Sequence, residues 1–335
     1  MEQRSIAEGS FKSVYRATWN RTGGGGAVMV ALLKLRQSSG NAVAIAGEVE
    51  VFFKLGRHPN LTPLLGMTTH PDGSDCMLVE FAELGSLDNL LVQKAEEGVE
   101  ISEAVRITIA MQICDGMSQL AEYDVVHRDL ACRNVLVFRF SPVDRAQVLV
   151  KVTDYGLALL DGGGTRGVTT HSGSDARPVR WLAPEALRTR RYSRASDVWA
   201  FGVTLWELWS DGMVPYWEVP SDEEVVRRVG TQGVTLGRPE NCIDAVWRVM
   251  EGCWARIAKD RPQFQPALKV LLQDAYAASV RNTSQRTCAI CWEREPVIAL
   301  QPCGHRSLCE ECAPEVQRCP ICRSPVAERQ RIYDS

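Results

Sequence analysis

Residues 125–137 read VVHRDLACRNVLV, which is the most informative stretch of the chain. It places a carboxylate, Asp129, and an amide, Asn134, five residues apart between two apolar runs. An isolated His-Arg-Asp triplet would most simply be a salt-bridged turn. Two further pieces follow in order, namely VTDYG with Asp154 and PVRWLAPEAL with Glu185. The order and spacing of these pieces, rather than any single residue, indicate a shared site.

Further pieces lie upstream of this stretch. The segment IAEGSFKSVYRATW (residues 6–19) surrounds Gly9, and VALLKLR (30–36) contains Lys34, the only lysine between positions 13 and 53. Short β-rich runs dominate up to about Glu80. After Gly85, apolar residues recur every three or four positions, a spacing that predicts helices. The pattern predicts a small β-rich part followed by a larger helical part.

Together these motifs resemble the catalytic domain of protein kinases, in the tyrosine-kinase and tyrosine-kinase-like group. The resemblance implies an α+β bilobal fold with a small β-rich N-lobe and a large helical C-lobe. Composition changes at the polar run AASVRNTSQRT. We therefore predict a kinase domain over residues 1–278, a linker over 279–287 and a separate C-terminal domain over 288–335.

The resemblance also implies an ATP- and magnesium-dependent phosphotransferase site. Asp129 would accept the proton of the attacking hydroxyl, while Asn134 and Asp154 would bind magnesium. Lys34 would contact the phosphates and pair with Glu48. The other residues implied at the site are Arg133 beside the catalytic aspartate and Gly9, Val14, Val79, Glu80 and Ala82 around the nucleotide. The resemblance further predicts that Asp197 and Arg261 are buried anchors and that Arg261 pairs with Glu185.

The residues after the catalytic aspartate bear on substrate choice. Ala131 stands where serine/threonine kinases commonly carry a lysine, and Arg133 and the Arg180-Trp181 pair are similar to tyrosine kinases. Tyrosine is therefore the favoured acceptor. Three departures leave a weakly active scaffold as an alternative. Ala7 and Lys12 replace two glycines of the glycine-rich loop, and Leu32 stands where a small alanine usually packs on adenine.

Seven of the twelve cysteines fall between positions 288 and 322. Four ligand pairs follow one another there, and eight nitrogen or sulfur donors are what two tetrahedral zinc sites need. The pattern resembles a C3HC4 RING finger of the inhibitor-of-apoptosis type, in which ligand pairs alternate in a cross-brace. The resemblance assigns Cys288, Cys291, Cys309 and Cys312 to the first zinc, and Cys303, His305, Cys319 and Cys322 to the second. A segment this short cannot bury an adequate core, so metal binding would supply much of its folding free energy.

The RING resemblance implies an E3 ubiquitin ligase module. Ile290, Pro320 and Arg323 stand where such domains contact a ubiquitin-conjugating enzyme, and the tail after Pro325 is similar to a dimer-forming segment. Two alternatives remain open. The kinase fold could be a scaffold that recruits proteins for ubiquitination, or the RING could serve only for dimerisation.

Composition narrows the partners and the compartment. A net charge of −3 and a pI near 6.0 argue against a nucleic-acid partner. No apolar run approaches the ~18 residues of a membrane span. The first residues, MEQRSIAEGSFK, do not resemble a signal peptide. We therefore predict a cytoplasmic protein, with a nuclear location also compatible, in which clustered cysteines hold metal rather than form disulfides.

Overall fold

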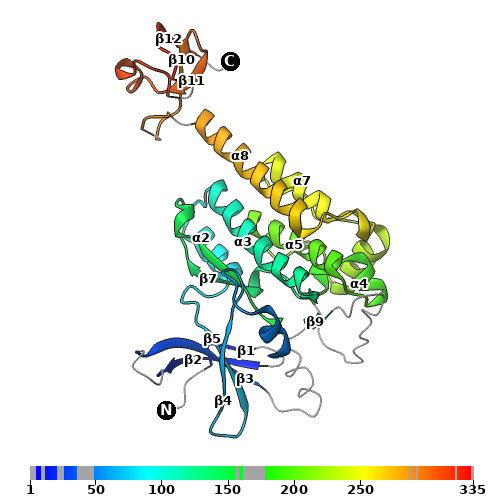
Figure 1. Cartoon of the computed structure of the whole chain (residues 1–335). Coiled ribbons are helices and arrows are strands. Elements are labelled where there is room, and N and C mark those ends of the chain that lie inside the picture. The colour runs from blue at the N-terminus through cyan, green and yellow to red at the C-terminus, as the bar shows by residue number, and fades with distance from the viewer. Residues whose placement is uncertain are drawn as a thin grey trace. The chain divides into compact units, whose positions relative to one another are not determined.

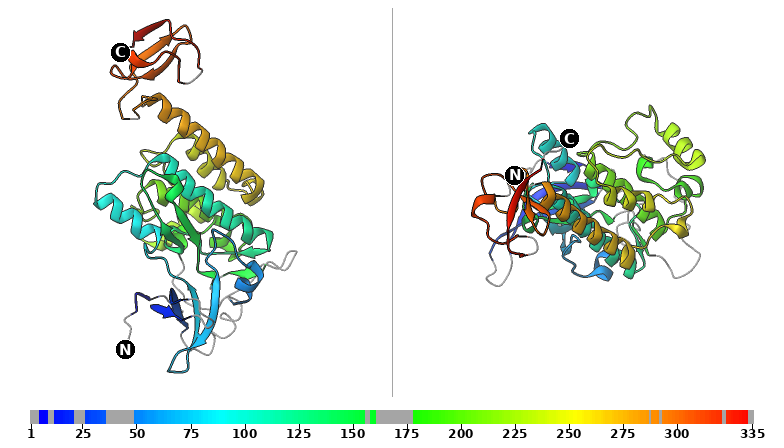
Figure 2. Two further views of the ribbon diagram at one scale, coloured as in Figure 1. Left: turned by 60° about the vertical axis from the view of Figure 1, so that its left-hand side comes forward. Right: turned by 90° about the horizontal axis from the view of Figure 1, so that it is seen from above.

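The structure is a computed structural model that describes residues 5–8, 12–20, 26–35, 49–155, 158–160, 178–286, 288–291, 293–320 and 323–332. Two compact units divide the chain, Met1–Leu272 and Gln273–Ser335. The first unit consists of a small lobe built around a sheet and a larger helical lobe (Figures 1 and 2). The predicted bilobal α+β fold is confirmed.

The small lobe is built on a five-stranded sheet in the order β1-β2-β3-β5-β4. The strands are β1 (Ala7–Glu8), β2 (Lys12–Trp19), β3 (Val28–Leu35), β4 (Leu64–Thr69) and β5 (Asp75–Glu80). All neighbouring strands run antiparallel. A helical segment, described over residues 49–55, belongs to the same lobe and buries Val51 and Phe52.

The large lobe is mainly helical. It also contains two small two-stranded sheets beside residues 127–134, which we call the catalytic loop. Its helices are α2 (Leu87–Glu96), α3 (Glu103–Glu122), α4 (Pro184–Thr189), α5 (Arg194–Trp209), α6 (Asp222–Arg227), α7 (Asp244–Cys253) and the start of α8 (Lys269–Arg286). Its strands are β6 (Val125–Val126), β7 (Val135–Arg139), β8 (Leu149–Val152) and β9 (Leu159–Leu160). Strand β6 pairs with β9 at the start of the stretch 125–137, and β7 pairs with β8 at its end. The loop between β6 and β7 is therefore fixed on both sides.

Local sequence explains the two central helices. Ser102 caps α3 by accepting a hydrogen bond from the Val105 amide, and Ser193 begins α5 with a reciprocal capping box. Helix α5 is buried along nearly its whole length, as expected for a helix that is apolar on all sides. Gly202 allows α7 to approach closely, because a β-carbon there would lie 2.7 Å from Cys253 Cβ. Helices α3 and α5 both pack against β6, the strand that leads into the loop.

Helix α8 continues through most of the predicted linker. The backbone is helical from Lys269 to Arg286, so residues 279–286 of the predicted 279–287 linker belong to the helix. Residues 279–286 include two arginines and one glutamine, which favour helix, among serine, valine, asparagine and threonine, which favour it less. The polar composition that suggested a linker therefore did not mark the end of the helix.

The second unit contains a small three-stranded sheet in the order β11-β10-β12. Its strands are β10 (Ile298–Gln301), β11 (His305–Leu308) and β12 (Glu328–Arg331). Its small core combines aliphatic side chains such as Leu300 and Leu308 with ligand cysteines such as Cys288. A core this small supports the expectation that metal ions contribute to its stability.

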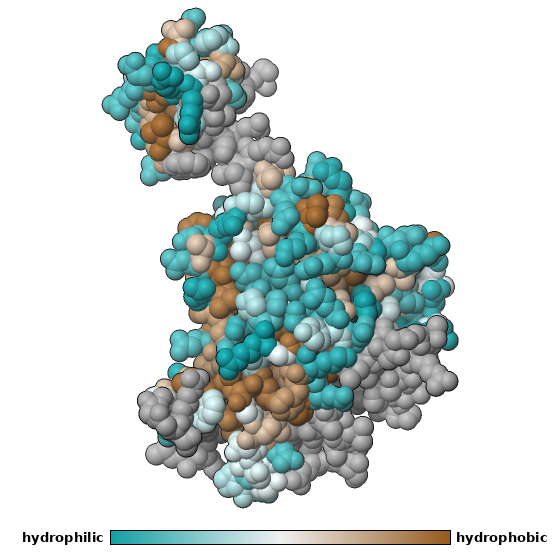
Figure 3. Space-filling view, in the orientation of Figure 1, coloured by the Kyte–Doolittle hydropathy of each residue, from teal (hydrophilic) through white to brown (hydrophobic). Residues whose placement is uncertain are grey.

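Apolar side chains also gather at the surface where the two lobes of the first unit meet, on the face drawn in Figure 3. The nucleotide-contact candidates Val79 and Ala82 are buried in this region of the chain. Over the described part of the chain, no helix is long and apolar enough to cross a membrane.

Candidate active site and metal centre

The catalytic loop is held from below by a buried carboxylate. Asp197, at the start of α5, is 2% exposed and accepts hydrogen bonds from the backbone amides of His127 and Arg128 at 2.7 and 3.0 Å. Arg128 has a φ of 72°, a conformation that costs a non-glycine residue about 1–2 kcal/mol. The two bonds to Asp197 stabilise this backbone. The prediction that Asp197 is a buried anchor is confirmed.

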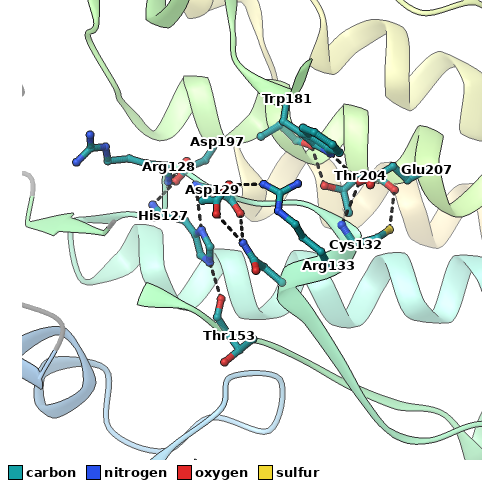
Figure 4. A network of polar contacts seen from close by, with 12 residues as sticks. His127, Arg128, Asp129, Cys132, Arg133, Thr153, Trp181, Asp197, Thr204 and Glu207 are labelled. Carbon is teal, nitrogen blue, oxygen red and sulfur yellow. Dashed lines mark hydrogen bonds and ion pairs between the residues drawn. The ribbon is translucent and has the colours of Figure 1, made fainter. Parts of the chain in front are cut away.

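Asp129 is oriented by three neighbours (Figure 4). The Asn134 side-chain nitrogen donates to Asp129 Oδ2 at 2.9 Å and to the Asp129 carbonyl at 2.7 Å. The guanidinium of Arg133 pairs with Asp129 Oδ1, and the Asp129 amide donates to His127 Nδ1 at 3.2 Å. The Asp129 side chain keeps 16% of its surface exposed. A substrate hydroxyl could therefore reach a carboxylate whose direction is already set.

His127 and Tyr155 connect this loop to the segment after β8 that carries Asp154. His127 is fully buried and its Nε2 lies 3.0 Å from the Thr153 carbonyl. Tyr155 is 1% exposed and donates its hydroxyl proton to the Val152 carbonyl at 3.0 Å. Its ring makes an edge contact with Phe52, with centroids 4.9 Å apart. These contacts fix the residue that follows Asp154 in the protein interior.

A second network lies beside Asp129 (Figure 4). The Arg133 guanidinium carbon lies 4.4 Å from the ring centroid of Trp181, whose indole nitrogen donates to Glu207 Oε2 at 2.8 Å. The same oxygen accepts a 3.0 Å hydrogen bond from the Cys132 amide. Stacking on an indole restricts a guanidinium, so α5 positions Arg133 through Trp181. Glu207 was not singled out from the sequence, although a carboxylate inside an apolar helix signals a buried partner network.

Burial raises the pKa of the Glu207 carboxyl from its ordinary 4.5 to about 7, while the Trp181 and Cys132 hydrogen bonds oppose the shift. Between these values the folded chain binds more protons than the unfolded chain, so this group's contribution to stability decreases as pH rises. A Glu207→Gln variant keeps an acceptor oxygen but does not titrate. We expect the free energy of unfolding of the native chain to fall, relative to this variant, by up to about 3 kcal/mol between pH 4.5 and 7.

Urea unfolding of both proteins at pH 5 and pH 7.5, followed by tryptophan fluorescence, measures this difference. Glu83→Gln, at an exposed position, is the matched control and should follow the native chain at both pH values. Parallel curves for the native chain and Glu207→Gln would show that Glu207 does not titrate in this range.

The structure does not bring Lys34 to the catalytic residues. Its ammonium pairs with Asp72, in the turn between β4 and β5. That hydrogen bond is the main reason why the pKa of Asp72 is lowered and the pKa of Lys34 is raised. Lys12 instead lies beside Asp154, with its ammonium nitrogen 2.8 Å from Asp154 Oδ1. The sequence predicted Lys34 at the phosphate site, whereas the structure places it beside Asp72. Its predicted partner Glu48 falls outside the described residues.

The nucleotide-contact candidates of the small lobe and hinge are placed as follows. Val14 lies on β2 opposite Leu33 of β3, and Val79, 3% exposed, lies on β5 opposite Ala31. Ala82 is buried, and its carbonyl accepts a hydrogen bond from the Gly85 amide at 3.2 Å. The Glu80 carboxylate pairs with Lys151. Gly9 falls outside the described residues.

The predicted ion pair that closes the large lobe is confirmed. Arg261 is 5% exposed and binds both carboxylate oxygens of Glu185, at 2.7 and 2.9 Å. It also donates to the carbonyls of Ala195 and Ala255. A bidentate pair of this kind fixes orientation as well as charge. It fixes the segment after Trp181 to the base of the lobe.

Two groups of metal-binding side chains occur in the described part of the second unit. The ligand atoms of Cys288, Cys291, Cys309 and Cys312 all lie within 4.8 Å of one another, and so do those of Cys303, His305 and Cys319. Cys322, the predicted fourth member of the second group, falls outside the described residues. The first group draws on two pairs that are separated in sequence by the Cys303–His305 pair. This is the alternation predicted for a cross-brace.

The first group has the dimensions of a tetrahedral zinc site. Cys291 Sγ and Cys309 Sγ lie 3.9 Å apart, and sulfurs bound at ~2.3 Å around one tetrahedral ion are separated by about 3.8 Å. In the second group His305 Nδ1 is buried and has no hydrogen-bond partner among the described residues. A buried nitrogen without a proton partner suits a metal ligand. The donor sets therefore fit zinc.

Three residues were predicted to contact a conjugating enzyme. Ile290 lies between two ligands of the first group and is 51% exposed. Pro320, between the two ligands of the last pair, and Arg323, directly after that pair, are also exposed. Their exposure is compatible with binding a partner.

Comparison with known proteins agrees with this geometry. A family profile for protein tyrosine and serine/threonine kinases matches residues 1–271, and a profile for the C3HC4-type zinc finger (RING finger) matches residues 284–329. Tyrosine-protein kinase csk-1 of Caenorhabditis elegans is 36% identical over 252 residues, covering 75% of this chain and 43% of the relative. The transforming protein Abl of Abelson murine leukemia virus is 34% identical over 262 residues (78% and 32%), and Abl of Drosophila melanogaster is 36% identical over 279 (82% and 16%).

The bilobal fold and the Asp129–Asn134–Asp154 arrangement define a phosphotransferase-type catalytic domain. The chain belongs to the protein tyrosine and serine/threonine kinase family, and a RING-type zinc finger follows the kinase domain. The chain spans less than half the length of each of the three relatives.

Proposed function

We propose that the chain is an ATP- and magnesium-dependent protein kinase that favours tyrosine and is joined to a RING E3 ubiquitin ligase. The observation that carries the kinase part is the orientation of Asp129. Its carboxylate receives hydrogen bonds from Asn134 and Arg133 and retains an exposed edge. A positioned, partly exposed carboxylate of this kind can act as a general base.

The residues divide the chemistry as follows. Asp129 accepts the proton of the substrate hydroxyl as that oxygen attacks the terminal phosphorus of ATP, whose bond to the bridging oxygen breaks to release ADP. Asn134 uses its amide nitrogen to hold Asp129, so its amide oxygen is the atom available to magnesium, together with the Asp154 carboxylate. Bound magnesium would neutralise charge on the phosphate oxygens. His127 links the loop to the segment that carries Asp154 through its contact with the Thr153 carbonyl.

Three features favour tyrosine as the acceptor. Ala131 leaves no cation two residues after Asp129. Arg133 is held beside Asp129 by its contact with Trp181, which gives a flat cationic and aromatic surface suited to a phenol. The relatives csk-1 and Abl are named tyrosine-protein kinases.

The test is transfer of labelled phosphate from ATP by the purified full chain to a mixed peptide library, followed by phosphoamino-acid analysis. Phosphotyrosine as the main product supports the proposal. Phosphoserine or phosphothreonine as the main product would move the chain to the serine/threonine side. A complete lack of magnesium-dependent transfer would leave the scaffold alternative.

The proposed ligase function rests on the RING and its exposed surface. We expect Arg323→Ala to abolish most ubiquitin-chain formation while zinc content stays unchanged, because Arg323 is not a ligand but offers several donors to an enzyme–ubiquitin junction. Ile290→Ala should weaken binding of the conjugating enzyme by about tenfold, since it shortens an exposed apolar anchor. Chain formation is measured with a panel of conjugating enzymes and the full-length protein.

Arg318→Ala is the matched control, because Arg318 is an exposed arginine in the same loop. It should retain chain formation. If the native protein contains zinc yet builds no chains with any enzyme of the panel, the ligase proposal is wrong. Dimerisation then remains the function of the RING.

A further inference from the structure

The pairing of β3 places Lys34 and Leu33 on opposite faces of the small-lobe sheet. Leu33 lies opposite Val14 on β2 and Met77 on β5, while Lys34 lies opposite Ser13 and Cys76. Directly paired residues of antiparallel strands share a face, and successive residues alternate between faces. Leu33 therefore shares its face with the two nucleotide-contact candidates Val14 and Val79. Lys34 does not.

The face that carries Leu33 is the one that meets the catalytic lobe. Lys12 pairs with Leu35, two residues after Leu33, so it belongs to this face. Its ammonium nitrogen lies 2.8 Å from Asp154 Oδ1, and its side chain is only 14% exposed. Lys34 extends from the other face to Asp72, a carboxylate in a surface turn that is 47% exposed. The two lysines therefore point to different carboxylates on different sides of the sheet.

We propose that Lys12, and not Lys34, is the lysine that contacts the phosphates of ATP. The inference rests on the proposed kinase function, in which Asp154 binds the magnesium that accompanies those phosphates. A lysine that already lies within hydrogen-bond distance of Asp154 is close to them, and its long flexible stem allows it to follow the ligand. Leu33, the β3 residue on the same face of the sheet as Lys12, cannot supply a charge.

This assignment also accounts for two departures from the kinase pattern. Lys12, at the start of β2, occupies the place of a loop glycine, so it supplies the cation that β3 lacks on this face. The strand register places Ala31, rather than Leu32, on the face shared with Val79. A small residue is therefore available next to the adenine position. The crowding that Leu32 suggested does not arise.

The direct test is labelling of the full chain with an acyl phosphate of ATP. A lysine amine near the phosphates attacks the acyl carbon, forms an amide and releases ATP. Peptide mass spectrometry is expected to find the label on Lys12, with labelling suppressed by excess ATP. Suppressible label on Lys34 instead of Lys12 would overturn the inference. If no labelling is suppressed by ATP, nucleotide binding itself fails, and the proposed kinase function falls with it.

Variants give an independent measurement. Lys12→Met should weaken binding of magnesium–ATP at least about fivefold and lower kcat/KM for ATP by about tenfold to one hundredfold, because a charge-assisted hydrogen bond to phosphate is lost. Lys34→Met should stay within about twofold of the native chain. Lys54→Met, an exposed lysine of the same lobe, is the matched control. Fluorescent-nucleotide titration and thermal unfolding are recorded for each.

A rescue variant separates the role of Lys12 from simple damage to the loop. The double change Lys12→Gly with Leu33→Lys moves the cation to the strand position on the same face. It is expected to recover at least about tenfold of the lost kcat/KM relative to Lys12→Gly alone. No recovery, together with an unaltered kcat/KM in Lys12→Met, would contradict the assignment.

Discussion

Replacing Asp129 by asparagine is expected to reduce phosphate transfer at least about one hundredfold, the usual scale of general-base catalysis. The change preserves the size of the side chain and one acceptor oxygen but removes the group that takes the substrate proton. The binding of ATP should change little, because Asp129 is proposed to contact neither the phosphates nor magnesium, and asparagine keeps an acceptor oxygen for the Asn134 amide. Initial rates with a tyrosine peptide and labelled ATP measure the effect.

Asp124→Asn provides the control for this experiment. Asp124 lies five residues earlier in the chain and pairs with Arg194 at an exposed position, so its loss should leave transfer near the native rate. The Asp129→Asn protein should keep the thermal stability of the native chain within a few degrees. Near-native turnover by a folded Asp129→Asn protein would show that another group removes the proton.

Removing zinc is expected to unfold the RING while the kinase unit stays folded. Structural zinc contributes about 10–16 kcal/mol to small domains of this kind, far more than the few aliphatic side chains of the RING core could supply. A strong chelator should therefore abolish amide-exchange protection in β10 to β12. Protection in α3 and α5 should persist, because both helices lie in the other compact unit.

Two cysteine variants, one in each unit, make this test specific. Cys288→Ser should reduce the zinc content below the two ions per chain that the two ligand groups predict, and it should expose the strands in the same way as the chelator. Cys253→Ser, in the kinase unit, should leave zinc content unchanged. Strands β10 to β12 that stay protected after complete metal removal would rule out a metal-dependent fold.

Several features could be predicted from the sequence because they depend on spacing along the chain. The five-residue interval from Asp129 to Asn134 fits on one tight loop, which the structure places between β6 and β7. The Arg261–Glu185 pair and the buried Asp197 were predicted from the resemblance to kinases, and the structure confirms both. The Cys-x2-Cys pairs predicted the two metal groups. Only the interval from Asp129 to Asn134 is set by local chain connectivity, because the ion pair, the Asp197 contacts and the metal groups each join separate segments.

Other features depended on contacts between distant segments. Glu207 becomes part of the site only because α5 packs beneath Trp181 and Cys132. The polar composition of residues 279–286 did not reveal that α8 continues there, because helix propensity does not require an apolar pattern. The Glu207 contacts require two segments to be placed in space, whereas the length of α8 is a local property that polar composition did not reveal.

The two lysines show this limit most clearly. By itself the sequence determined that the small lobe carries a β-strand with Lys34, a glycine-containing segment before it, and nucleotide-contact candidates after it. Only the tertiary structure decided which lysine faces the catalytic residues. Side chains alternate along a strand with a period of two, so a shift of one position moves a residue to the opposite face. The hydrogen-bond register with β2 and β5 sets that position, and it places Lys12 beside Asp154 and Lys34 beside Asp72.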